Sequence, residues 1–210
     1  MKKLKAWGFF LSFIGLWAPI NINAFYCDAD TLCSSEFEVE VKFSAFFPSS
    51  KIVRCIYSDV MPYYEIEVSK PFCNDWQMWL GAGYISNHGH AIGCGNKTDF
   101  QLIPITGGIK YFYQITPCID LYAGAGACVS FFNNRDHSPF VHKSVFDGAL
   151  GGIFESGLTY FIQDRIYLNV FTEYLYQHFS FKHKYEEHYT IRHNLNMSGL
   201  KIGGGIGIEF

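Results

Sequence analysis

Apolar and polar residues alternate one by one through most of the chain from residue 36 to the C-terminus. In residues 37–45, for example, Phe37 and Val39 flank Glu38, and the same alternation continues beyond them. Successive side chains of a β-strand point to opposite faces, so a period of two is typical of strands whose two faces have unlike surroundings. The pattern predicts eight strands, at residues 37–45, 64–69, 76–85, 101–114, 119–129, 148–161, 166–176 and 197–210.

The connections between these strands alternate in length. Long polar loops are predicted at 48–61, 87–99, 133–146 and 179–196, and short turns at 71–75, 116–117 and 163–165. All long loops then lie at one end of the sheet and all short turns at the other. A transmembrane barrel has this arrangement, with the longer loops outside the cell, whereas nothing in a soluble sandwich requires it. The predicted fold is therefore all-β: an eight-stranded antiparallel transmembrane up-and-down β-barrel.

The last predicted strand has an apolar face that ends in an aromatic residue. This face carries Leu200, Ile202, Ile206, Ile208 and Phe210. Tyrosines near the ends of other strands fit an aromatic girdle at the membrane interface. They are Tyr84, Tyr111, Tyr113, Tyr160, Tyr174 and Tyr176.

The first residues have the pattern of a secretory signal. Three lysines within the first five residues precede an apolar stretch that Pro19 ends, and Ala24 offers a cleavage site. The apolar stretch is shorter than the roughly 20 residues that a membrane-spanning helix needs. We expect residues 1–24 to be a signal peptide and 25–210 an outer-membrane barrel domain, with 25–35 as a short periplasmic segment.

Charge and cysteine content exclude some functions. The net charge is −3, and the mature region has no stripe of basic residues, so a nucleic-acid partner is not expected. The seven cysteines include no C-x-x-C pair of the kind found in zinc or redox sites. In an exported protein we expect disulfides within loops or turns, with at least one thiol unpaired because the count is odd.

Three short motifs carry a resemblance to a known family: LYAGAG at 121–126, EYLY at 173–176 followed by Phe179, and GGGIGIEF at 203–210. With these motifs the chain resembles the small OmpA/OmpX-like outer-membrane barrels and their opacity-protein relatives, over nearly all of the mature region. The cysteine content departs from that pattern. The resemblance implies export to the bacterial outer membrane, with barrel-assembly machinery and outer-membrane lipid as partners. It also implies an assembly signal in the closing residues Ile206, Ile208 and Phe210.

If the apolar faces meet lipid, the charged residues on the opposite faces fill the lumen. The predicted lumen charge network consists of Glu38, Glu40, Lys42, Glu65, Glu67, Lys110, Asp120, Glu155, Glu173, Lys201 and Glu209. Paired carboxylates can do acid–base chemistry, but an eight-stranded barrel is only wide enough for packed side chains. We therefore expect internal salt bridges rather than a catalytic or conducting lumen.

Two further readings concern the loops. His178 and Ser180 lie two apart near the end of a predicted strand, which resembles the arrangement in outer-membrane lipid A hydrolases and is an alternative reading. All eight histidines fall in predicted outer loops, where they could bind a transition metal or titrate together near pH 6, but solvated polar loops explain them more simply. We expect no catalytic residue, metal or cofactor.

These arguments predict a non-enzymatic barrel with a packed, charged lumen. Its four outer loops would form a structural or adhesive surface for an extracellular or host ligand. A small-solute channel is the other alternative, and it would require a lumen with fewer charge pairs.

Overall fold

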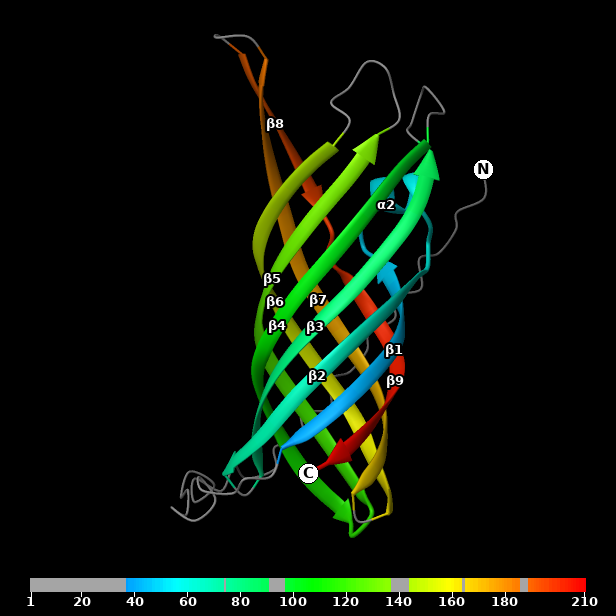
Figure 1. Ribbon diagram of the computed structural model, residues 1–210, viewed down its shortest axis with the longest axis vertical. Helices are drawn as coiled ribbons and strands as arrows, with labels where there is room; N and C mark the ends of the chain where they lie inside the picture. Colours follow the sequence, from blue (N-terminus) through cyan, green and yellow to red (C-terminus); the bar gives the residue numbers. More distant parts are fainter. Residues whose placement is uncertain (1–36, 74, 91–96, 137–143, 164, 186–188) are drawn as a thin grey trace, which may run out of the picture.

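The computed structural model describes residues 37–73, 75–90, 97–136, 144–163, 165–185 and 189–210. It contains nine strands, of which β8 lies outside the wall and the other eight form a closed barrel (Figure 1). The wall strands are β1 (Glu38–Pro48), β2 (Met61–Cys73), β3 (Trp76–His90), β4 (Lys97–Thr116), β5 (Ile119–Asp136), β6 (Ser144–Gln163), β7 (Ile166–Tyr185) and β9 (Gly199–Glu209). All pairings are antiparallel, and pairing of β1 with β9 closes the cylinder. The predicted eight-stranded antiparallel barrel is confirmed.

The outer surface of the wall is apolar because each strand directs its aliphatic and aromatic residues outward. Val41 on β1 lies in register between Ile66 on β2 and Ile206 on β9, and all three side chains are exposed. Leu80 and Phe154 are more than 60% exposed on other strands. Soluble monomers rarely expose apolar patches larger than a few hundred Å², so a surface of this kind suits the hydrocarbon region of a bilayer. No helix in the described part of the chain has the length and apolar character needed to cross a bilayer.

The interior has two layers of different character. Toward the short-turn end, charged and polar side chains such as Lys42, Glu67 and Lys201 are fully or almost fully buried. Toward the other end, the lumen is filled by an apolar cluster. This apolar layer consists of Phe46, Val53, Met61, Tyr63, Ile85, Phe100, Leu102, Cys128, Phe132, Leu175, Phe179 and Met197.

A short helix, α2 (Lys51–Ile56), covers the apolar layer in the connection between β1 and β2. Ser50 begins the helix, and its side chain accepts a hydrogen bond from the Val53 backbone N–H at 3.5 Å. A serine N-cap of this kind satisfies one of the free N–H groups of the first turn. Val53 is fully buried in the apolar layer, while Lys51 and Arg54 are exposed. The sequence predicted only a loop here.

The predicted loop at 179–196 is wrong. β7 continues to Tyr185 and pairs with β8 (Tyr189–Asn196) from His178↔Asn196 to Tyr185↔Tyr189. This β7–β8 hairpin extends beyond the wall and is the long projection at the top of Figure 1. The predicted loops at 87–99 and 133–146 are also shortened by strand residues, because β3, β4, β5 and β6 all run further than the alternation indicated.

The hairpin leaves the wall at Gln177. Pairing of β6 with β7 begins at Gly151↔Gln177, and beyond that point the partner of β7 is β8. The Gln177 side chain donates to the Ala149 carbonyl at 2.8 Å and accepts from the Ser130 hydroxyl at 3.1 Å. Its backbone N–H donates to the Ser198 hydroxyl at 2.9 Å. Side chains thus complete the hydrogen bonding where the two ladders diverge.

The predicted short turns are confirmed at the opposite end, where the C-terminus also lies (Figure 1). β4 and β5 are separated by residues 117–118 only, and β2 and β3 by residues 74–75. The expected signal peptide and the segment 25–35 lie outside the described residues.

Candidate functional site

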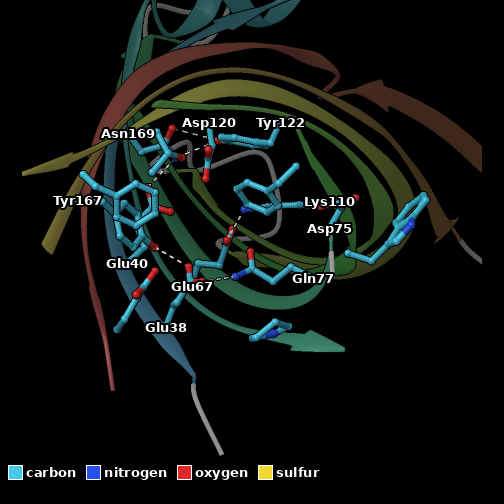
Figure 2. A pocket seen from close by; sticks show the side chains of 16 residues that line it. Glu38, Glu40, Glu67, Asp75, Gln77, Lys110, Asp120, Tyr122, Tyr167 and Asn169 are labelled. Atoms are coloured by element: carbon cyan, nitrogen blue, oxygen red, sulfur yellow. Dashed lines mark hydrogen bonds and ion pairs between the residues drawn. The ribbon is translucent and has the colours of Figure 1, made fainter. Parts of the chain in front are cut away.

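The lumen holds a cavity of about 170 Å³ at the short-turn end of the barrel. Glu38 and Asp120 lie on its wall (Figure 2), and Glu209 lines it as well. Each of the three is only partly buried. Glu38 accepts a hydrogen bond from the Tyr167 hydroxyl at 3.1 Å and another from the Gln77 side chain. The structure thus places three of the eleven predicted network residues at the mouth of the lumen.

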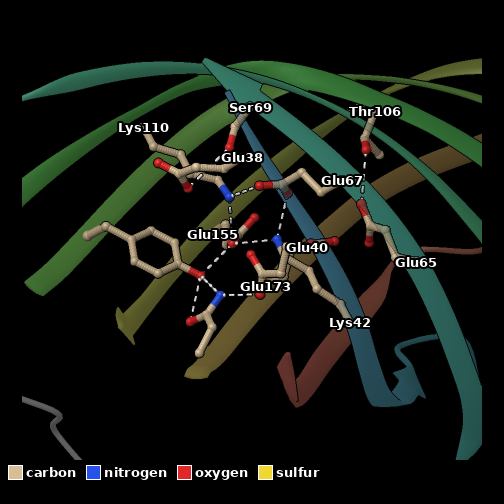
Figure 3. A network of polar contacts seen from close by, with 12 residues as sticks. Glu38, Glu40, Lys42, Glu65, Glu67, Ser69, Thr106, Lys110, Glu155 and Glu173 are labelled. Carbon is tan, nitrogen blue, oxygen red and sulfur yellow. Dashed lines mark hydrogen bonds and ion pairs between the residues drawn. The ribbon is translucent and has the colours of Figure 1, made fainter. Parts of the chain in front are cut away.

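Beyond the cavity, two lysines share two carboxylates at the centre of the barrel (Figure 3). The Lys42 Nζ lies 2.6 Å from Glu67 Oε2 and 3.0 Å from Glu155 Oε1. The Lys110 Nζ contacts the other oxygen of Glu67 and lies 3.4 Å from Glu155 Oε1. All four side chains are at most 3% exposed, so the pairs are shielded from water and salt.

A second ion-pair group lies between the first and the apolar layer. Lys201 on β9 contacts Glu173 on β7 and lies 3.5 Å from Glu65 Oε2 on β2. Its Nζ also lies 3.9 Å from the centre of the Tyr63 ring, a cation–π contact. Thr106 donates to Glu65 at 3.1 Å. Buried charges require pairing of this kind, because moving an unpaired charge out of water costs several kcal/mol of folding free energy, on the order of the whole stability of a domain.

Neutral polar side chains connect the ion pairs. The Tyr122 hydroxyl donates to Glu155 Oε1 at 2.6 Å, and the Asn169 side chain donates to Glu40 Oε1 at 2.8 Å. Asn169 also donates to the Tyr122 hydroxyl oxygen at 2.9 Å. Glu40 therefore joins the network through the amide of Asn169.

Glycines on adjacent strands provide room for the lumen tyrosines. A Cβ at Gly157 would lie only 2.6 Å from the Tyr122 hydroxyl oxygen. Gly83 faces Tyr63 and Gly207 faces Tyr167 in the same way. A lumen as narrow as that of an eight-stranded barrel holds large side chains only where the facing position is small.

The eleven predicted lumen residues thus divide by position. Eight are buried along the network: Glu40, Lys42, Glu65, Glu67, Lys110, Glu155, Glu173 and Lys201. Glu38, Asp120 and Glu209 are only partly buried and line the cavity, together with Glu40, Glu67 and Lys110 of the network. Sequence reasoning missed the apolar layer beyond them, although Phe46, Ile85 and Phe179 occupy inward positions of the same alternation.

The two residues of the hydrolase alternative lie two positions apart on β7, and each contacts another residue. His178 and Ser180 are both exposed on the outer face of β7. The Ser180 hydroxyl donates to Asn194 Oδ1 at 3.2 Å, and the His178 ring packs against Tyr176 with ring centroids 4.9 Å apart.

Among the histidines whose side chains are described, His88 pairs with Asp99 through Nδ1 at 2.6 Å, and His90 is exposed. The described residues contain no group of three or more metal-ligating side chains. His137, His142 and His188 lie outside the described residues. The expectation that the loop histidines are solvated polar residues and bind no metal therefore stays a prediction.

Four of the cysteines lie in the described part of the chain. Cys73, at the end of β2, is disulfide-bonded. Cys55 and Cys118 are free and exposed, and Cys128 is free and buried in the apolar layer. The expected disulfide framework therefore leaves more than one thiol unpaired.

The predicted assembly residues line the outer face of the closing strand. Ile206, Ile208 and Phe210 are between 44% and 58% exposed. The Phe210 ring stacks on Phe37 with centroids 5.1 Å apart, and the Phe210 backbone N–H donates to the Phe37 carbonyl at 2.9 Å. The end of the chain is thus joined to the residue that precedes the first strand.

No protein-family model matches the chain, and no curated protein matches it. Solved structures do. Neisserial surface protein A is 16% identical with a TM-score of 0.61, covering 83% of this chain and 97% of its own. OprG of Pseudomonas aeruginosa is 15% identical with a TM-score of 0.64, covering 83% and 95%. Ail of Yersinia pestis, solved with the heparin analogue sucrose octasulfate, is 15% identical with a TM-score of 0.52, covering 83% and 98%.

All three neighbours are bacterial surface or outer-membrane barrels, and the match extends over nearly their whole length. The apolar outer surface of the present barrel agrees independently with a position in a lipid bilayer. The chain has the fold of the small OmpA/OmpX-like outer-membrane β-barrels.

Proposed function

We propose that the protein is a non-enzymatic outer-membrane barrel whose outer end binds an extracellular ligand, and that residues 1–24 direct its export. The observation that carries the proposal is the filled lumen. An ion-pair network and an apolar layer follow one another along the barrel axis, so the interior acts as a plug and the outer end is left to interact with other molecules.

The plug argues against the channel alternative. Lys42 and Lys110 are held between Glu67 and Glu155, and Phe46 and Phe100 are fully buried in the next layer. A solute would have to separate buried ion pairs and then cross an apolar region. Interiors of eight-stranded barrels are typically filled in this way.

The outer end offers a surface that projects from the wall. The β7–β8 hairpin extends beyond the other strands, and α2 lies at the same end with Lys51 and Arg54 exposed (Figure 1). Two exposed cations at the same end as a projecting hairpin suit an anionic ligand. Because the Ail structure holds a heparin analogue, a sulfated polysaccharide is the first ligand to test.

Two measurements test the proposal. In planar bilayers, the refolded protein should give no ion conductance, and a steady open conductance would favour the channel. On immobilised heparin, the protein should bind, and a variant in which residues 181–193 are replaced by Asn-Gly should bind at least tenfold more weakly. Ser180 and Asn194 are paired, so a two-residue turn can close the shortened hairpin.

Controls separate loss of binding from loss of fold. The shortened variant should keep its heat-modifiable migration, since the wall below Gln177 is unchanged. The unshortened Lys51→Gln variant tests the contribution of α2. For the enzyme alternative, Ser180→Ala should leave the acyl chains of outer-membrane lipid unchanged, and a change in their number would contradict a non-enzymatic role.

A further inference from the structure

The cavity at the short-turn end is bounded by side chains from all eight strands of the wall. It is distinct from the outer surface considered above, because the ion-pair network and the apolar layer lie between the two. Its volume of about 170 Å³ exceeds what a single water or metal ion needs. Figure 2 shows the polar side chains that point into it.

Aromatic rings form much of its wall. Phe112 and Tyr122 lie together with centroids 5.2 Å apart, and Phe161 and Tyr167 lie together at 5.7 Å. Trp76 lines the cavity as well. The faces of aromatic rings attract cations through their quadrupoles, and groups of rings are used to hold organic ammonium ions.

The lining is strongly acidic. It includes six carboxylates and one ammonium group: Glu38, Glu40, Glu67, Asp75, Asp120 and Glu209 against Lys110. Within the described residues, the ion pairs of the Lys110 Nζ are with Glu67 and Glu155.

Two of these carboxylates face one another across a strand pair. Glu38 on β1 is directly opposite Glu209 on β9, and both line the cavity. Like charges directly opposite in a sheet are destabilising, and a cation between them relieves the repulsion. Nearby, Asp120 Oδ1 is shielded from solvent and has no hydrogen-bond partner among the described residues.

We propose that this cavity binds a small organic cation, with its ammonium group at Glu38, Asp120 and Glu209 and its carbon chain against the aromatic rings. A bare metal ion would use the carboxylates but not the rings. The combination of acidic groups, aromatic walls and a volume larger than an ion favours an aliphatic amine.

Calorimetry on the refolded full-length barrel in detergent tests the proposal with 1,4-diaminobutane as the probe. We expect saturable binding, and a neutral 1,4-butanediol control should give none. Asp120→Asn with Glu209→Gln should weaken binding of the diamine at least tenfold. The matched control Asp59→Asn, an exposed carboxylate near the opposite end, should not change it.

A second variant separates amine from metal. Phe161→Leu should weaken diamine binding several-fold while leaving any calcium binding unaffected. The proposal is overturned if the diamine gives no saturable heat at 10 mM, if butanediol binds equally well, or if calcium binds more tightly than the diamine. All variants must first show heat-modifiable migration, and an unfolded Glu209→Gln protein is replaced by Asp120→Asn alone.

Discussion

Lys201→Met removes the central charge of the inner ion-pair group without removing its volume. Lys201 is fully buried, contacts Glu173, and lies 3.5 Å from Glu65 Oε2. Methionine keeps an unbranched apolar chain against the Tyr63 ring, so the loss of charge is the main change. The two carboxylates then remain buried without their ammonium partner.

The expected loss in the free energy of unfolding depends on which ion-pair contacts each carboxylate keeps. Removing one partner of a buried ion pair costs about 3 to 5 kcal/mol. Within the described residues, Lys201 is the ion-pair partner of Glu173, so we expect Lys201→Met to cost about 5 kcal/mol, at the upper end of that range. Lys42→Met should cost about 3 kcal/mol, because Lys110 still contacts both Glu67 and Glu155.

Urea unfolding of the barrel in lipid vesicles, followed by tryptophan fluorescence, measures both free energies of unfolding. The double variant Lys201→Met with Glu173→Gln should recover about half of the loss, since only Glu65 is then buried without its ammonium partner. If both single variants cost less than about 1 kcal/mol, the value of an exposed ion pair, the description of the lumen as a sealed charge network is refuted.

Three other predictions concern packing, the lipid face and assembly. Gly157→Ala should destabilise the barrel by about 1 to 3 kcal/mol by pushing on Tyr122, whereas Gly148→Ala on the same strand, with no atom nearer than 3.8 Å, should be neutral in the same unfolding assay. Ile206→Lys should cost about 2 to 4 kcal/mol if this outward position lies near the bilayer midplane, and an equal result for Ile206→Leu would contradict the lipid-facing assignment. Deletion of Phe210 should lower the amount of protein in the outer membrane while secretion continues, as measured by membrane fractionation, and unchanged membrane levels would argue against an assembly signal.

The alternation predicted the architecture because it reports directly on two unlike environments. Lys42 and Val41 have opposite exposures in the structure, as their positions in the sequence required. The ends of strands were harder to predict. In the β7–β8 hairpin both faces lie outside the lipid, so the contrast between polar and apolar neighbours no longer marks where pairing stops.

Specific contacts within the lumen could not be predicted from the sequence. Alternation indicates that Glu67 and Lys110 point inward, but which lysine meets which carboxylate depends on the stagger of β2 against β4 across the barrel. The apolar layer was missed for a different reason. Phe46 and Phe100 occupy inward-facing positions of the alternation. If every inward-facing residue is assumed to be polar, such aromatic residues are taken as exceptions to the pattern and not as a second layer.

The junction at Gln177 separates two parts of the chain that can change independently. Below it, Gly151 and Gln177 begin the ladder that holds the wall together. At the junction itself, Ala149, Ser130 and Ser198 satisfy the side chain and backbone N–H of Gln177. Insertions, deletions or foreign epitopes placed between Ser180 and Asn194 therefore leave the wall's hydrogen bonds intact, so surface variation at this hairpin carries little cost to barrel stability.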